Sequence, residues 1–166
     1  MAKEQDPFGT NPDKASAKIR INNNLIAACL TIFGMIWALA PGRLTSLIIL
    51  QFVIAIPLLY ASNIAYTKIA YWKKVKLWEY MGWFAGTTGT ALVFNILGLL
   101  IFSLGFAELA IVYFVVMWLC LLAYTLINIH YSLEYNPHPK DLNYKVFKLF
   151  YFISIQLVFG IIPLYI

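Results

Sequence analysis

The chain has 166 residues, of which 62% are hydrophobic and only 11% are charged, with a formal net charge of +5. A soluble domain carries about 25% charged residues to keep its surface in water. The composition therefore excludes a water-soluble globular domain and predicts an all-α integral membrane protein. Residues 1–22 form a polar leader that we expect to be disordered, and residues 23–166 form a single membrane domain.

The membrane domain contains five long apolar stretches. A helix needs about 20 apolar residues to cross the hydrocarbon core of a bilayer, and a continuous apolar run favours a helix over the alternating pattern of a barrel strand. We therefore predict five transmembrane helices with short connections. In chain order they cover Asn24–Ala40, Ser46–Tyr66, Tyr80–Phe102, Leu109–Tyr131 and Phe147–Ile166.

The basic residues predict the orientation of these helices. Of the 12 Lys and Arg residues, all but Arg43 lie on one side of the predicted spans. Positively charged loops stay in the cytoplasm, so we expect a cytoplasmic N-terminus and a C-terminus outside, in the plasma (inner) membrane. This distribution explains the net charge through topology and gives no reason to expect a nucleic-acid partner. Membrane lipids are the expected partners of the basic side.

A weak internal repeat runs along the chain. Similar apolar residues surround Gly34, Gly98 and Gly160 in the first, third and fifth spans, and the contexts of Asn63 and Asn128 also match. This pattern indicates a two-helix unit repeated in parallel, an arrangement known in transport folds, with an unpaired fifth helix that a partner chain could cover. The alternative is chance similarity between apolar segments.

The third span contains a stripe of small residues, Gly82, Gly86 and Gly89, while Thr88 and Asn95 lie on roughly the opposite face. Small residues at this spacing allow another helix backbone to approach closely. We expect this span to lie at the centre of the bundle. The stripe predicts close packing within the chain, with homodimerisation as the alternative.

Polar residues within the spans suggest a small polar cavity. Pro57 removes one hydrogen bond from the second span and kinks it. The remaining candidate residues have amide or hydroxyl side chains. Hydrogen bonds between helices are the favoured alternative explanation for these amides. The candidate cavity residues are Gln51, Pro57, Asn63, Thr88, Asn95 and Asn128.

One cluster of ionisable residues follows the fourth span, where His130, Glu134 and His138 are spaced by four. On one uninterrupted helix they would share a face, as metal ligands do, but Pro137 and Pro139 interrupt such a helix. A solvated helix end is therefore the favoured interpretation, and a metal-binding or pH-sensitive site is the alternative. We expect no cofactor and no resident metal.

No charged residue lies deep within a predicted span, so the sequence lacks the groups that an ion pathway requires. It also lacks the residue groups of membrane enzymes. We expect a non-enzymatic helix-bundle subunit that forms a homo-oligomer or joins other membrane subunits. The alternative is a transporter or channel protomer for a neutral or lipid-like solute, favoured by the repeat, the kink and the amides.

Overall fold

The computed structural model describes residues 12–71, 76–135 and 139–165, and every element in these ranges is helical. Five of the helical stretches are long and apolar enough to cross a membrane, which confirms the predicted number. The long helices are α1 (Pro12–Leu39), α2 (Ser46–Tyr71), α3 (Lys76–Ser103), α4 (Ala107–Tyr135) and α5 (Pro139–Gln156). The short elements are η1 (Pro41–Arg43), η2 (Leu157–Ile161) and η3 (Ile162–Leu164).

The first helix starts earlier than the sequence predicts, at Pro12 instead of Asn24. Proline fits the first turn of a helix because its N–H would have no partner there, and the alanine and lysine residues that follow favour helix. The described part of the expected disordered leader, residues 12–22, is therefore a helical extension of the first span.

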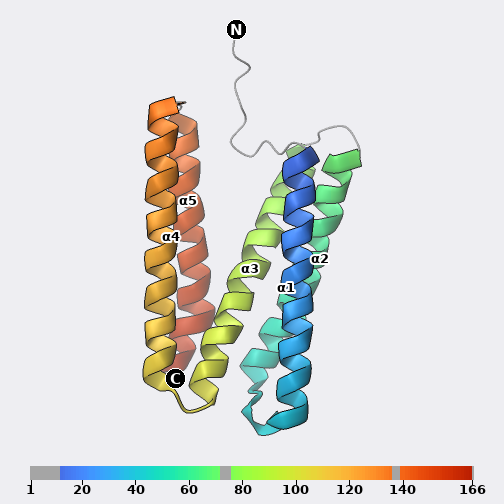
Figure 1. Cartoon of the computed structure of the whole chain (residues 1–166), viewed down its shortest axis with the longest axis vertical. Helices are drawn as coiled ribbons and strands as arrows, with labels where there is room; N and C mark the ends of the chain where they lie inside the picture. Colours follow the sequence, from blue (N-terminus) through green and yellow to red (C-terminus); the bar gives the residue numbers. More distant parts are fainter. Residues whose placement is uncertain (1–11, 72–75, 136–138, 166) are drawn as a thin grey trace.

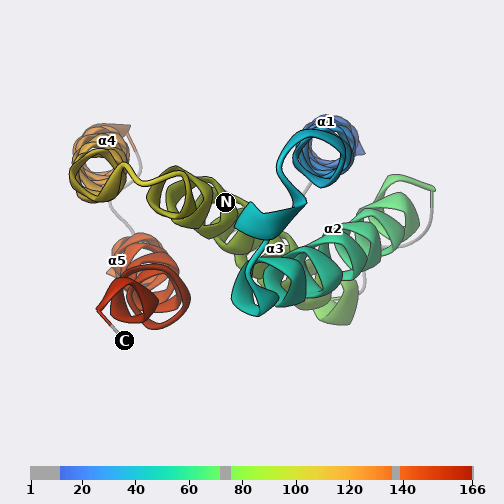
Figure 2. The same ribbon diagram turned by 90° about the horizontal axis from the view of Figure 1, so that it is seen from below.

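The helices form a three-helix bundle and a separate hairpin (Figure 1). The bundle contains α1, α2 and α3, and the hairpin contains α4 and α5. The tilted α3 joins the two parts and contacts all four other helices. It also buries the largest share of its residues, so the structure places it at the centre, as predicted. Seen from below, α1 and α4 stand apart on the same side of α3 (Figure 2).

We name the two ends of the molecule by their charge. The basic end contains the start of α1, the end of α2, the end of α4 and the start of α5. Lys14, Lys18, Lys68 and Lys145 lie there. The far end contains Arg43 and the turn between α3 and α4. The hairpin lies close to α3 at the far end and diverges from it toward the basic end (Figure 1).

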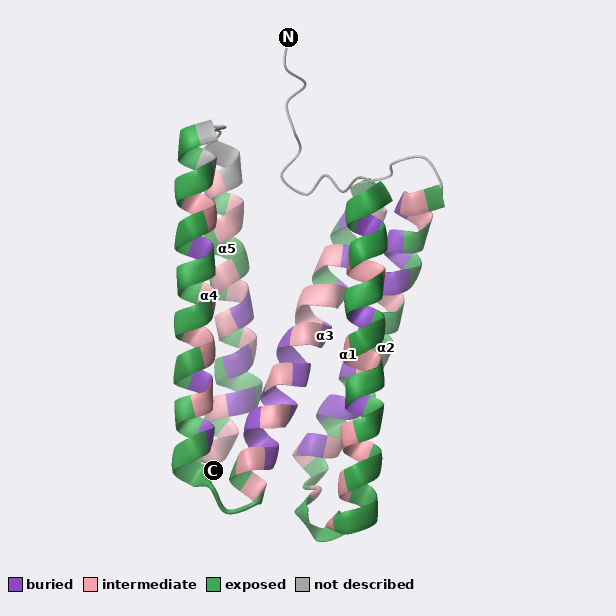
Figure 3. Ribbon diagram, viewed as in Figure 1, coloured by how far each residue is buried: buried purple, intermediate pink, exposed green. Residues whose placement is uncertain are grey.

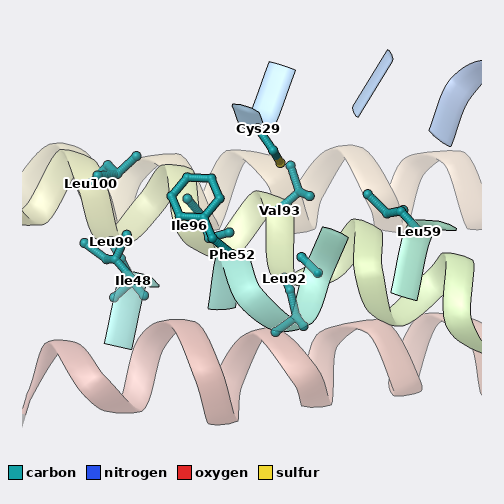
Figure 4. Close-up of a cluster of buried hydrophobic side chains, with 10 residues drawn as sticks. Cys29, Ile48, Phe52, Leu59, Leu92, Val93, Ile96, Leu99 and Leu100 are labelled. Carbon is teal, nitrogen blue, oxygen red and sulfur yellow. The ribbon is translucent and has the colours of Figure 1, made fainter. Parts of the chain in front are cut away.

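The main apolar core lies between α1, α2 and α3, where Cys29, Phe52 and Ile96 pack together (Figure 4). The outer faces of α1 and α4 are exposed along most of their length (Figure 3). Large apolar side chains such as Leu30 and Leu119 lie on these faces. A surface of this kind suits the hydrocarbon of a bilayer, where apolar side chains have no need of burial within the protein.

The last turns of the fifth span are irregular, since α5 continues as the π-helical η2 and the 3-10 turn η3. Pro163 has no N–H to donate to the carbonyl of Phe159 four residues earlier. The side chain of Gln51 in α2 donates to this carbonyl instead, at 2.6 Å. The irregular end of the chain is thus tied to the three-helix bundle at the far end.

Candidate functional site

A cleft of about 600 Å³ opens between the three-helix bundle and the hairpin in the basic half of the molecule. Residues of α1 and α3 line one side, and residues of α4 and α5 line the other. The lining combines three kinds of side chain. The basic ones are Lys14, Lys18, Lys145 and Lys148; the uncharged polar ones include Asn22, Thr87, Thr90, Thr125 and Asn128; the large ones include Trp83, Phe94, Leu121, Tyr144 and Phe152.

Glycines close the cleft toward the far end by bringing α3 and the hairpin together. A Cβ on Gly98 would overlap the ring of Phe114, and Phe114 is fully buried. A Cβ on Gly160 would lie 2.7 Å from Oδ1 of Asn95 and 2.9 Å from the Phe114 ring. Only residues without a Cβ allow helices to pack this closely, so these contacts hold the far end of the hairpin against α3.

Aromatic residues pack between α3 and α5 beside the cleft, and two of them, Trp83 and Tyr144, line it. The ring of Trp83 lies 5.8 Å from that of Tyr144 and 5.6 Å from that of Tyr151, measured between centroids. The hydroxyl groups of Tyr151 and Thr88 are 2.7 Å apart and hydrogen bonded. These bulky side chains keep the backbones of α3 and α5 further apart than the glycines do, which accounts for the open basic end.

A buried polar network borders the cleft on the bundle side. Asn22 donates hydrogen bonds to Ser62 and to Asn63, both at 3.0 Å. Ser62 donates to the carbonyl of Gly82 at 2.8 Å, and Asn63 donates to Asn23 at 2.7 Å. The network therefore fixes α1, α2 and α3 relative to one another, and Asn22 connects it to the cleft.

Four lysines line the mouth of the cleft. Lys18 is half-buried, donates to the hydroxyl of Tyr66 at 3.1 Å, and lies 4.6 Å from the centroid of that ring. The like charges of Lys148 and Lys14 and the opposite charge of Glu79 act on Lys18. Lys145 donates to the carbonyl of Asn128 at 2.9 Å. An anion at this mouth would meet basic groups from both sides.

The glycine stripe of the third span packs against α2 within the chain. Added Cβ atoms at Gly82 and Gly89 would lie 2.9 Å from the side chains of Tyr66 and Leu59, and one at Gly86 would lie 2.7 Å from Ser62. The stripe is thus occupied by α2, in line with the favoured packing interpretation.

The structure does not bring the candidate cavity residues into one site. Only Asn128 among them lines the cleft. Gln51 and Asn95 donate to backbone carbonyls at the far end, the latter to Ile155 at 3.3 Å. Asn63 belongs to the polar network, Thr88 pairs with Tyr151, and Pro57 lies on an exposed face of α2.

The histidine cluster is partly described. Nε2 of His130 lies 3.9 Å from the carboxylate of Glu134, and both side chains are well exposed. His138 lies outside the described residues. Within the ranges that the structure describes, no three His, Cys, Asp or Glu residues form a group able to hold a metal ion.

The sequence did not predict the cleft, because the lysines are explained by topology and lipid contact, and of the candidate cavity residues only Asn128 lines it. The threonines at 87 and 90 in the third span and at 125 in the fourth were the available signal, since hydroxyl groups in apolar helices can form hydrogen bonds between helices or at a polar surface. No family model, curated protein or solved structure matches the chain.

Proposed function

We propose that the protein is a membrane transport protomer that binds a lipid-like solute in the cleft. The observation that supports this most is the mixed lining of the cleft, with lysines at its mouth and Phe94, Leu121 and Phe152 deeper in. Its volume of about 600 Å³ is that of a small-molecule site. Such a site suits a solute with a polar head and an apolar body.

The distribution of charge supports an inward-facing site. By the positive-inside rule the basic end is cytoplasmic, so the cleft opens toward the cytoplasmic leaflet. The glycine contacts at Gly98 and Gly160 then form the barrier on the other side. Alternating access would require these contacts to separate while the basic end closes.

The expected role as an assembly subunit receives less support from the geometry. One argument for it was the small-residue face of the third span, and α2 covers that face. Another was the fifth helix that a two-helix repeat would leave unpaired, and within the chain α5 packs against both α3 and α4. Assembly with other chains stays a prediction.

Native mass spectrometry of protein gently extracted from its own membrane tests the proposal. We expect one amphiphile to stay bound to the wild-type protein and to be lost from Thr90→Trp, because the indole would fill the cleft. Leu121→Trp, from the opposite wall, should have the same effect. Thr31→Trp is the matched control, since Thr31 lies on the exposed face of α1.

Each variant must first unfold at the same temperature as the wild type, which shows that it is folded. If the two folded cleft variants retain as much amphiphile as the Thr31→Trp control, the cleft is not the solute site and the proposal is wrong. Wild-type protein that emerges bound to further subunits and carries no amphiphile would instead favour the assembly function.

A further inference from the structure

We infer that the solute is an amphiphile with a net anionic phosphate head, held between Lys18 of α1 and Lys148 of α5. This inference rests on the proposed function, because it names the chemical class of the solute bound in the same cleft. It goes beyond the expectation of a neutral or lipid-like solute by specifying the charge of the head and the residues that recognise it.

The lysines converge on the mouth from both sides of the cleft. Lys14 and Lys18 belong to the bundle, and Lys145 and Lys148 belong to the hairpin. Lysines that only set topology have no need to face one another, since any position near the membrane surface serves that purpose. Convergence from two separate parts of the fold indicates recognition of a common ligand.

Four like charges line the same cleft, from Lys14, Lys18, Lys145 and Lys148. Like charges brought together at a partly desolvated site destabilise one another. A bound anion would remove this repulsion and would form charge-assisted hydrogen bonds with the ammonium groups.

Lys18 is already oriented for such a ligand. Its hydrogen bond to the Tyr66 hydroxyl, at 3.1 Å, and its position beside the Tyr66 ring hold the ammonium group at the cleft wall. Lys148 is exposed on the opposite wall. Fixing a group in its binding position before the ligand arrives reduces the entropic cost of binding.

The lining changes from charged to apolar with depth. Along α3 the cleft extends from Trp83 to Phe94, which at 1.5 Å per residue is about 16 Å. The deepest lining residues of the hairpin are Leu121 and Phe152, each several residues further in than the lysines. A free inorganic anion would make no use of this apolar depth, whereas the acyl chain of a lipid would.

The test compares three probes by binding to the purified protein: phosphatidylglycerol, phosphatidylcholine with the same acyl chains, and inorganic phosphate. Native mass spectrometry measures binding of the two lipids, and thermal stabilisation compares inorganic phosphate with phosphatidylglycerol. We expect phosphatidylglycerol to bind most tightly. In K18Q/K148Q its affinity should fall by roughly thirtyfold, because each lysine near an anionic headgroup contributes about fivefold in affinity.

Two variants act as controls. K76Q removes an exposed lysine at the same end of the molecule that does not line the cleft, so it should bind phosphatidylglycerol as the wild type does. K18R/K148R keeps both charges and should also retain binding, which separates loss of charge from loss of fold.

The outcomes separate this inference from the proposed function. Equal binding of the two lipids by the wild type, or equal phosphatidylglycerol binding by K18Q/K148Q and K76Q, would overturn the anionic head, while loss of lipid from Thr90→Trp would still support the cleft. If inorganic phosphate stabilises the protein as much as phosphatidylglycerol does, the cleft is a simple anion site, and the inference that the ligand is an amphiphile is wrong. Retention of both lipids by Thr90→Trp would contradict the proposed function itself.

Discussion

The far end and the basic end of the hairpin differ in how closely they approach α3. At the far end, Gly98 and Gly160 allow Phe114 to fill the space between three helix backbones. At the basic end, Trp83 and Tyr144 occupy the corresponding interface, and a cleft lined by lysines opens beside them. The size of the side chains along one interface thus decides where the molecule is closed and where it can hold a solute.

The far end should be the more sensitive to added volume. Gly98→Leu forces a side chain into the position of the buried Phe114 ring, and we expect a loss of about 3 kcal/mol in the free energy of unfolding, as for an overpacked core. Thermal unfolding in detergent measures the effect.

Gly34 provides the matched control for this substitution. It occupies the equivalent position of the apolar pattern in the first span, yet no atom lies within 4 Å of an added Cβ. Gly34→Leu should therefore leave stability unchanged or raise it slightly, because glycine weakens a helix interior. Equal destabilisation by both substitutions would contradict the close packing at the far end.

A smaller effect should come from the tie between α2 and the end of α5. Gln51 donates a hydrogen bond to the Phe159 carbonyl, to which Pro163 cannot donate because it has no N–H. Gln51→Leu should therefore be more costly in the wild type than in a Pro163→Ala background, where an N–H becomes available. A double-mutant cycle by thermal unfolding should give a coupling of about 1 kcal/mol, the net value of one hydrogen bond. Strict additivity would show that Gln51 does not replace the missing helix bond.

The sequence predicts much of the bundle and little of the cleft. Continuous apolar runs predict the five helices because each run satisfies the length that a bilayer requires. The glycine stripe and the polar residues opposite it predict the central position of α3. These are local properties of single helices, which periodicity and composition report directly.

The cleft depends on contacts between distant helices. Lys18 and Lys148 have the same local pattern as any interfacial lysine, and only the tertiary arrangement shows that they line one mouth. The pairing of Gly98 with Phe114 likewise joins two helices whose crossing the sequence does not define. The candidate polar residues failed to predict the cleft since most of them form hydrogen bonds between helices instead.

Photo-crosslinking with an anionic phospholipid that carries a diazirine in its acyl chain, followed by peptide mapping, tests whether the cleft binds such an amphiphile. We expect crosslinks to concentrate on cleft residues such as Thr90 and Leu121, and to disappear from them in K18Q/K148Q. Crosslinks at Leu119 and Leu126, on the exposed face of α4, that are as intense as those at the cleft residues would report only the surrounding lipid. That result would contradict a specific amphiphile site in the cleft.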